Sequence, residues 1–430
     1  MNDQKVIVWL CNVPVRVISE AAGFPFTVGG GWLEKLSYLL SKQEKLSLHY
    51  CFFTKYFTEK SEGDANGIAY HAFPHTISTS LDNTTQCLKT FLLTVKPDIV
   101  HIFGSEYITS YAMVLACQKT GLLDRTILHI QGLVSVSTKH YDSGIPWLWK
   151  HLMMPRDFLK NASIAHGKRD FARRGKSEIE TIKLLKHISG RTDWDRACTY
   201  HINPRAEYHF CNETLREIFY RHQWDINKCE RYSIFVSQGN YPIKGLHFML
   251  EALPLILRHY PDTHLYIGGS DPTAQGGSLK AKLKRTSYGQ YLLYLVKKHN
   301  LSKHIVFTGP LDEHQMCERL LKSHVFVSPS TIENSPNSLG EAMILGMPCV
   351  ASYVGGVANM LKDKEEGFLY QADAPYMLAH YVMQMFENDE MAIHMGNQAR
   401  IHALRTHSAE VNLENLLNIY RKINNNGTTI

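Results

Sequence analysis

The stretch "SPSTIENSPNSLGEAMILGMPCVAS", residues 328–352, decides the fold of this 430-residue chain. It opens at the end of the apolar run "VFVSPS", which is typical of a buried strand. Ser335 is a suitable N-cap, and Pro336 fits the first helical position because its missing N–H is not needed there. Gly346 is suited to end the helix, and Pro348 opens the next strand. The stretch therefore predicts a strand, a turn, a helix and a second strand.

The first turn of this helix is predicted to attract a phosphate. The backbone amides of Asn337, Ser338 and Leu339 are expected to be unpaired and to point out of the positively polarised helix end. Glu333 lies before the helix and Glu341 lies within it. Carboxylates repel a phosphate but accept hydrogen bonds from hydroxyls. The pattern suits a diphosphate flanked by two polyols, as in a nucleotide sugar; a capped helix with an exposed and a half-buried glutamate is the alternative.

Short apolar runs alternate with helical patterns along the whole chain. In the first half, strands are predicted at residues 5–11, 46–53, 68–73, 98–103 and 126–131. In the second half, they are predicted at residues 232–238, 263–269, 304–309, 324–329 and 348–352. This alternation predicts parallel sheets covered by helices on both faces. Ligands of such sheets bind at the carboxyl ends of the strands.

The length of the chain is too great for one hydrophobic core and predicts two domains. A new strand opens at Tyr232, so the junction is expected just before it. We predict a first domain at residues 1–226, a second at residues 227–405, and a C-terminal helix at residues 406–430 that crosses back to the first domain.

The composition is that of an ordinary folded protein, with 44% hydrophobic and 20% charged residues. No apolar run approaches the roughly 18 residues of a membrane span, and the N-terminus has no signal-peptide pattern, so a cytoplasmic location is expected. The nine cysteines are never spaced as CxxC, and the 23 histidines form no HExxH pattern. These spacings predict neither a disulfide framework nor a zinc site.

A basic segment at residues 139–186 accounts for the net charge of +6, because it holds 11 Lys and Arg against 5 Asp and Glu. Trp147, Trp149 and Phe158 are interleaved with these cations. Aromatic and cationic side chains together favour an anionic membrane surface, and a peripheral location on the inner face of the membrane. An insertion packed on its own domain is the alternative. No nucleic-acid recognition motif accompanies the charge, so nucleic acid is not an expected partner.

The longer stretch "PSTIENSPNSLGEAMILGMPCVASYVGGVANML", residues 329–361, resembles the E(x7)E signature of glycosyltransferase family 4 with the G-x-P and GG elements that follow it. The resemblance covers most of residues 232–405, and the N-terminal half more loosely. It implies a GT-B fold: α/β, with two Rossmann-like doubly wound domains that face a central cleft. The first domain would bind the acceptor and the second the nucleotide-sugar donor. Within the family, the chain resembles members of the polysaccharide-biosynthesis type.

The resemblance also implies roles for residues of the donor site. Glu333 matches the glutamate that contacts the donor sugar, and Glu341 matches the one that binds the ribose hydroxyls. Ser338 and Leu339 match the helix-start amides on the diphosphate. Lys244, in "SQGNYPIKGLHFMLEAL", matches the lysine that neutralises the phosphates. As charge develops on the leaving nucleotide, such a cation would stabilise it, so Lys244 and Glu333 are the predicted catalytic pair.

A glycine run in "FTVGGGWLEKLSYLL" matches the family's N-terminal glycine loop. Gly30 and Gly31 would let the backbone approach the diphosphate closely, although a simple flexible turn explains them too. The family is generally independent of metals and needs no cofactor beside its donor, and the same is expected of this chain.

Three positions depart from the family pattern. An arginine that often precedes the lysine is replaced by the "QGN" of residues 238–240. A histidine often found at one strand end is replaced by Phe103, and another at the next strand end by Gln131. Phosphate binding would then depend on Lys244 and the helix end, and a histidine-assisted mechanism is not expected.

The acceptor side offers less specific signals. Glu106 would fit an acceptor role or would be an exposed loop glutamate, and Gln131 lies at the next strand end. Arg191 and Asp193, beside Trp194, could hold a sugar by bidentate hydrogen bonds and stacking. A structural salt bridge explains Arg191 and Asp193 equally well.

These features predict a retaining transferase for hexosyl or N-acetylhexosaminyl groups. The donor would be a nucleotide-diphosphate sugar, with UDP favoured, and the acceptor a hydroxyl of a glycan or a polyprenyl-diphosphate-linked saccharide in cell-surface polysaccharide synthesis. The alternatives are a nucleotide-sugar epimerase of GT-B fold and a catalytically silent nucleotide-sugar-binding subunit.

Overall fold

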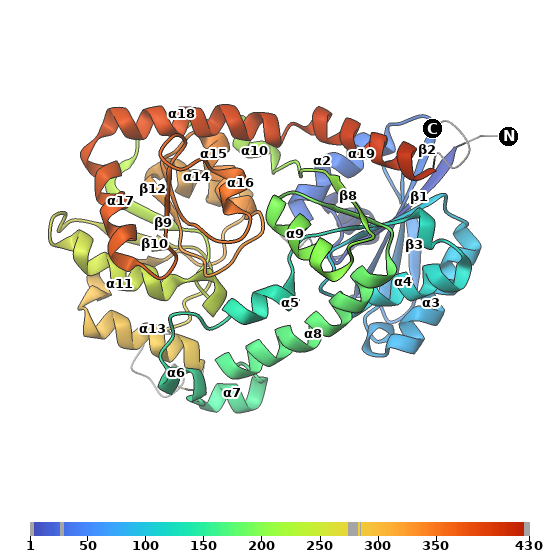
Figure 1. Ribbon diagram of the computed structural model, residues 1–430, viewed down its shortest axis with the longest axis horizontal. Helices are drawn as coiled ribbons and strands as arrows, with labels where there is room; N and C mark the ends of the chain where they lie inside the picture. The colour runs from blue at the N-terminus through green and yellow to red at the C-terminus, as the bar shows by residue number, and fades with distance from the viewer. Residues whose placement is uncertain (1–3, 26–29, 274–282, 284, 425–430) are drawn as a thin grey trace. The chain divides into compact units, whose positions relative to one another are not determined.

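Two compact units make up the chain, and their elements can be followed by colour in Figure 1. The computed structural model describes residues 4–25, 30–273, 283 and 285–424. The first unit comprises residues 1–135, 173–216 and 406–430. The second unit comprises residues 136–172 and 217–405.

Within the described residues, the first unit contains an eight-stranded sheet in the order β3-β4-β2-β1-β5-β6-β7-β8. Only the pair of β3 and β4 is antiparallel; the other neighbours are parallel. Its strands are β1 Lys5–Leu10, β2 Leu46–Thr54, β3 Ser61–Ala65, β4 Ile68–Pro74, β5 Ile99–Phe103, β6 Thr126–His129, β7 His187–Gly190 and β8 Glu207–Phe210. The strand order reverses at β1 and β5, which is the place where open α/β sheets bind ligands.

The described part of the second unit contains a six-stranded sheet in the order β11-β10-β9-β12-β13-β14, with all neighbours parallel. Its strands are β9 Glu230–Val236, β10 His264–Ile267, β11 Ile305–Phe307, β12 Ser323–Ser328, β13 Cys349–Ser352 and β14 Phe368–Tyr370. The order reverses between β9 and β12. The loops that follow these two strands are therefore the expected ligand edge of this unit.

Helices connect the strands of each unit. Those of the first unit are α1 Arg16–Ala22, α2 Gly31–Ser41, α3 Leu81–Val95, α4 Ile108–Thr120, α9 Asp193–Ile202 and α19 Ala409–Asn424. Those of the second are α6 Trp147–His151, α7 Pro155–Lys160, α10 Glu217–Tyr220, α11 Leu246–Leu257, α13 Ser287–Lys298, α14 Glu313–Lys322, α15 Asn337–Leu345, α16 Val357–Met360 and α17 Pro375–Glu387. Three helices contain unit boundaries: α5 Val134–Ser137, α8 Ile164–Leu184 and α18 Asp389–Thr406.

The central strands are buried on both faces, as in β5 and β12, where every residue is buried. Continuous apolar runs are typical of such strands, and each of the ten predicted strands is present with shifts of at most two residues at its ends. The ten predicted ranges do not include β3, β7, β8 and β14, which have three to five residues and no long apolar run. Among the described residues, no helix is both long and apolar enough to cross a bilayer.

The predicted boundary of the first domain at residue 226 is wrong for residues 136–172, which pack with the second unit. Asp157 Oδ2 accepts a hydrogen bond from the Ser287 amide (3.0 Å), and His247 Nε2 lies 2.9 Å from the Ser143 carbonyl oxygen. Residues 217–226 also belong there, because Trp224 Nε1 donates to the Ser323 carbonyl (2.8 Å). These partners are far away in sequence, so the composition of the segment does not reveal them.

Residues 406–430 belong to the first unit. The Tyr420 hydroxyl accepts a hydrogen bond from Trp9 Nε1 (2.8 Å) and lies 2.7 Å from His101 Nδ1, so α19 packs against β1 and β5. Residues 425–430 lie outside the described residues.

Candidate functional site

Helix α15 starts one residue later than the sequence predicted. Pro336 is its N-cap, with ψ of 117°, and the first helical residue is Asn337. The predicted N-cap, Ser335, lies outside the helix because Pro336 is still extended. The predicted end is confirmed, since Gly346 has φ of 75° and its amide bonds back into the last turn.

The first turn of α15 is partly closed by its own backbone. The Leu339 amide donates to the Pro336 carbonyl (3.0 Å), so the prediction that this amide is unpaired is wrong. A bond of this kind tightens the first turn of a helix. Ser338 Oγ accepts a hydrogen bond from Ser237 Oγ (3.0 Å), which joins the residue after β9 to the start of α15.

Lys244 and Glu333 meet at the carboxyl ends of β9 and β12. Lys244 ends the short 3₁₀ helix Pro242–Lys244, and its Nζ lies 2.6 Å from Glu333 Oε1. Ser330 Oγ donates to the same carboxylate oxygen (2.9 Å). Burial alone would lower the pKa of Lys244, but the Glu333 carboxylate outweighs burial and raises it, so the lysine remains a cation over the whole neutral range.

Two glycines let the backbone approach this pair closely. Gly245 has φ of +65°, and a Cβ there would overlap sterically with the Pro329 carbonyl oxygen. Gly355 has φ of +51°, and a Cβ there would collide with the Glu333 carbonyl. The Gly356 amide donates to that carbonyl (3.0 Å). The positions of Lys244 and Glu333 therefore depend on residues without side chains.

Glu341 is the fifth residue of α15, and it is buried, whereas a half-buried side chain was the alternative reading. Lys244, Glu333, Asn337, Ser338, Leu339 and Glu341 thus all lie at or just behind the reversal edge of the second sheet. This edge combines a cation, a helix start and two carboxylates, which suits a ligand with phosphates and hydroxyls.

The glycine turn belongs to the first unit. Gly30 is the N-cap of α2 and Gly31 is its first residue. A Cβ at Gly31 would lie 2.8 Å from Arg216 Cγ, so this glycine leaves room for the arginine stem. Residues 26–29 of the predicted loop lie outside the described part of the chain.

Glu106 lies at the reversal edge of the first sheet, just after β5. Its carboxyl is shielded, and its Oε2 has no hydrogen-bond partner among the described residues, so the alternative of an exposed loop glutamate is wrong. Burial raises its pKa to about 7. A Cβ at Gly104 would lie 2.9 Å from Glu106 Oε2 and 3.0 Å from Asn12 Nδ2, so the loops after β1 and β5 converge here.

Gln131 and Arg191 converge on a residue that sequence reasoning missed, Glu213. Gln131 Nε2 donates to Glu213 Oε1 (2.5 Å), and Arg191 Nη1 donates to Glu213 Oε2 (2.6 Å). Burial alone would raise the pKa of Glu213, but Arg191, with His129 and Gln131, lowers it to about 2. The structural salt bridge is thus the reading that fits Arg191, with Glu213 as its partner.

A histidine does stand at the end of β6, although the sequence pattern placed Gln131 there. His129 is the last residue of the strand, and its Nε2 lies 3.5 Å from Glu213 Oε1. Its ring stacks with that of Trp32 at a centroid distance of 6.5 Å. The glutamate joins Gln131, Arg191 and His129 in one buried network.

Asp193 is the first residue of α9. It is exposed and lines a separate pocket of about 440 Å³ between α9 and the edge strand β8. The other lining residues are Ile188, Arg196, Ala197, Thr199, Tyr200, Asn203, Ala206 and Tyr208. The four acceptor-side candidates therefore lie in three places: Glu106 after β5, Gln131 with Arg191, and Asp193.

The buried pair of Arg191 and Glu213 predicts an acid dependence of stability. Because folding lowers the pKa of Glu213, its stabilising contribution is full above the usual glutamate value near 4.3 and is lost as the pH falls toward 2. At pH 7, the free energy of unfolding of the double variant Arg191→Met/Glu213→Gln is expected to lie within about 2 kcal/mol of the wild-type value. Its stability should fall less steeply between pH 4.5 and 2, as measured by urea unfolding. An equally steep fall in both proteins would contradict the ion-pair account.

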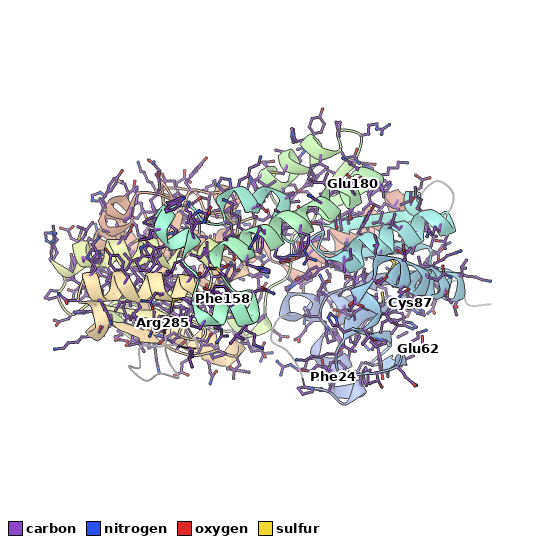
Figure 2. All side chains as sticks on the ribbon, turned by 90° about the horizontal axis from the view of Figure 1, so that it is seen from below. Phe24, Glu62, Cys87, Phe158, Glu180 and Arg285 are labelled. Carbon is purple, nitrogen blue, oxygen red and sulfur yellow. The ribbon has the colours of Figure 1, made fainter. Side chains whose placement is uncertain are left out.

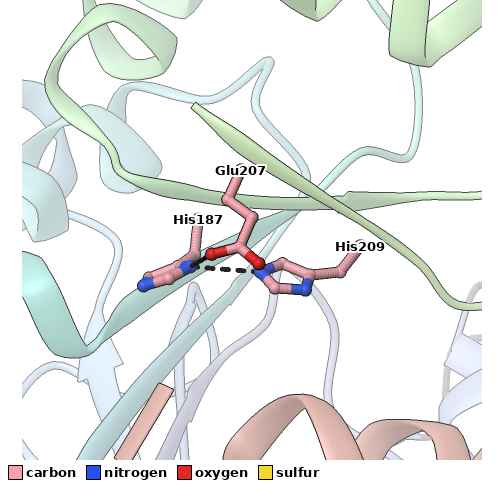
Figure 3. A group of neighbouring side chains, drawn as sticks. All are labelled: His187, Glu207 and His209. Carbon is pink, nitrogen blue, oxygen red and sulfur yellow. Dashed lines mark hydrogen bonds and ion pairs between the residues drawn. The ribbon is translucent and has the colours of Figure 1, made fainter. Parts of the chain in front are cut away.

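Among the residues that the structure describes, one group of side chains could hold a metal ion. His187, Glu207 and His209 offer ligand atoms within 4.8 Å of one another at the amino ends of β7 and β8. Figure 3 shows His187 Nδ1 beside both His209 Nε2 (3.1 Å) and Glu207 Oε2 (3.6 Å). Burial lowers the pKa of both histidines, that of His209 to about 4. Lys422 forms an ion pair with the other oxygen of Glu207, so the cluster is accounted for without an ion.

Part of the chain matches a protein family. Residues 217–402 match the family model described as glycosyl transferases group 1. The phosphatidyl-myo-inositol mannosyltransferase of Mycobacterium tuberculosis (strain ATCC 25618 / H37Rv) is 26% identical over 205 residues, which cover 46% of this chain and 48% of that protein. The poly(ribitol-phosphate) alpha-N-acetylglucosaminyltransferase of Staphylococcus aureus (strain COL) is 26% identical over 180 residues, 42% of this chain and 33% of that protein. The chain thus spans about half or less of these curated relatives.

Solved structures match over almost the whole chain. The sucrose-phosphate synthase from Thermosynechococcus elongatus has a TM-score of 0.71 at 13% identity. The match covers 99% of this chain and 100% of that one. Anabaena HepE, in complex with UDP and glucose, has a TM-score of 0.66 at 12% identity, with 96% and 98% covered. The expected α/β fold of two Rossmann-like units of GT-B type is confirmed.

Proposed function

Residues 217–402 form a domain of the glycosyl transferases group 1, and from this premise we propose that the protein is a retaining glycosyltransferase. The donor is a nucleotide-diphosphate sugar, with UDP favoured, and the transferred group is a hexose or N-acetylhexosamine. The acceptor is a hydroxyl of a glycan or of a polyprenyl-diphosphate-linked saccharide in cell-surface polysaccharide synthesis. The enzyme works as a peripheral protein on the inner face of the membrane.

The observation that carries the proposal is the contact of Lys244 with Glu333 at 2.6 Å, beside the start of α15. A diphosphate at this helix start would compete with the Glu333 carboxylate for the lysine ammonium. Lys244 would then neutralise the charge that develops on the leaving nucleotide. Glu333, released toward the sugar, would stabilise positive charge at the anomeric carbon. The exchange of partners gives both residues a role in the transition state.

Retention at the anomeric carbon is proposed to follow from attack on the face that the nucleotide leaves. The acceptor hydroxyl gives its proton to the departing phosphate oxygen, so the enzyme needs no carboxylate nucleophile. Catalysis then consists mainly of positioning and charge stabilisation. Glu341 would bind the ribose hydroxyls, and the Ser338 and Leu339 region of the helix start would face the diphosphate.

The relatives support the choice of substrates. One matched structure holds UDP and glucose, which favours a UDP-sugar donor. One matched relative is named for a mannosyl transfer to a phosphatidyl lipid and another for transfer to a ribitol-phosphate polymer. Glycan and lipid-linked acceptors are therefore the classes to test first.

Nucleotide binding is expected to raise the melting temperature. At about 100 times its dissociation constant, the correct nucleoside diphosphate among UDP, GDP, ADP and dTDP should add about 2.7 kcal/mol to the free energy of unfolding. The shift should persist in EDTA, because Lys244 rather than a metal ion neutralises the phosphates. It should be lost in Glu341→Ala and retained in the control Glu318→Ala, whose side chain is exposed on α14. No shift with any of the four, or a shift that EDTA removes, would contradict this account of the donor site.

A further inference from the structure

Helices α6 and α7 of the second unit expose a group of large apolar side chains. Trp147 is 72% exposed, Leu148 65%, Phe158 69% and Leu159 80%, and Met153 between the helices is 40% exposed. Figure 2 labels Phe158 on this part of the ribbon. We call these five residues the α6–α7 surface. Apolar side chains gathered in this way mark a contact site for a membrane or another protein.

The helices that carry this surface are held firmly on the unit. Between the exposed residues, the Trp149 ring packs against Tyr291 and Tyr294 of α13, at centroid distances of 5.4 and 5.1 Å. The buried Asp157 accepts hydrogen bonds from the amides of Met154 (2.8 Å) and Ser287 (3.0 Å), so one carboxylate caps both α7 and α13. The exposed side chains are therefore presented by an ordered support and are not the product of a frayed segment.

The charge around the surface is positive. Residues 146–161 contain Arg156, Lys160 and Lys150, whose Nζ lies 3.6 Å from the Asp142 carboxylate, and the single acidic residue within this range, Asp157, is buried. Arg156 and Lys160 are exposed on α7, next to Phe158 and Leu159. A partner for this surface must accept apolar side chains and carry negative charge. A second copy of the chain, paired symmetrically, would instead bring the same cations together.

We propose that the α6–α7 surface binds the interface of an anionic lipid bilayer. The apolar side chains enter the boundary between headgroups and acyl chains, and the cations lie against lipid phosphates. Within the basic segment of residues 139–186, the part proposed to contact the membrane is therefore residues 147–160. The inference specifies the membrane contact of the proposed enzyme, and it rests on the proposed function only in expecting a lipid-linked acceptor there.

Cosedimentation with vesicles tests the proposal. The full chain is expected to bind vesicles that contain phosphatidylglycerol, and to bind phosphatidylcholine vesicles more weakly. Phe158→Ser/Leu159→Ser should weaken binding to the vesicles by at least about tenfold, because it removes two apolar side chains that insert into the bilayer interface. Lys160→Gln should weaken it roughly fivefold at low salt and leave the residual binding less sensitive to salt.

A matched control is Leu93→Ser/Tyr376→Ser, which removes two apolar side chains that are 55% and 62% exposed on α3 and α17. Its binding should equal that of wild type. All variants should keep the wild-type melting temperature and nucleotide-induced shift, which shows that they fold and separates this proposal from the donor site. The proposal is wrong if wild type binds neither vesicle or if Phe158→Ser/Leu159→Ser binds as wild type does. It is also wrong if sedimentation shows a wild-type dimer that this variant converts to a monomer, since the surface then covers a second copy.

Discussion

Glu333→Gln is expected to lower the turnover number for sugar transfer by about 10²–10³. The amide keeps the shape of the side chain and can still accept a hydrogen bond from Ser330 Oγ, which now lies 2.9 Å away. It removes the negative charge that would face the anomeric carbon in the transition state. Binding of the nucleotide should not weaken, because Lys244 loses its competing carboxylate partner. The measurement is a steady-state assay with the donor identified by thermal stabilisation.

The control for this variant is Glu318→Gln, which removes an exposed carboxylate on α14 that pairs with Lys322. Its turnover is expected to match wild type. Full turnover in Glu333→Gln would refute the catalytic assignment. A loss of nucleotide binding together with turnover would mean that Glu333 holds the loop in place and does not act on the sugar.

Gly245→Ala is expected to reduce the free energy of unfolding by about 2–5 kcal/mol and to abolish nucleotide binding. The residue has φ of +65°, where a side chain costs about 1–2 kcal/mol, and its Cβ would collide with the Pro329 carbonyl. Relieving such an overlap costs a further 1–3 kcal/mol or so. Because Lys244 is the preceding residue, any shift of the backbone moves its ammonium away from Glu333. Thermal unfolding with and without nucleotide measures both effects.

Gly309→Ala separates the cost of the positive φ from the cost of the collision with Pro329. Gly309 also lies in the second unit with a positive φ of +77°, but a Cβ there would meet nothing within 4 Å. This control should lose only about 1–2 kcal/mol for its backbone conformation and should keep the nucleotide-induced shift. If Gly245→Ala unfolds no more easily than Gly309→Ala and still binds nucleotide, the close packing of the lysine loop against Pro329 has no functional role.

The strands could be predicted from the sequence because parallel strands buried on both faces leave continuous apolar runs. Strand β3, "SEGDA", has no such run and forms because its backbone pairs with β4. The unit boundary could not be predicted for residues 136–172. Their place depends on Asp157 and Trp149, whose partners lie on α13, more than 100 residues further along the chain.

The turn and helix that carry Glu333, Ser338 and Glu341 were predictable because their sequence pattern is local. Glu333, Ser338 and Glu341 lie on one turn and one helix, so a single stretch of sequence carries them. The network around Glu213 was not predictable in the same way. Glu213 is 82 residues from Gln131 and 22 from Arg191, and only the sheet brings these strand ends together. The short strand β8 before Glu213 was not among the predicted ranges.

The shielding of Glu106 shows a second limit of sequence reasoning. A glutamate after a strand is usually exposed, yet here the loops after β1 and β5 converge around it and raise its pKa to about 7. Asn12, more than 90 residues away in sequence, donates a hydrogen bond to the Phe103 carbonyl (3.2 Å) and so holds the loop after β1 at this strand end.

The central claim is that the edge after β9 and β12 binds the donor nucleotide. Hydrogen–deuterium exchange, followed by mass spectrometry with and without the nucleoside diphosphate that raises the melting temperature, tests it most directly. The account predicts slower exchange in peptides that cover residues 237–245 and 330–341. Unchanged exchange in both segments, with protection elsewhere in the chain, would contradict it.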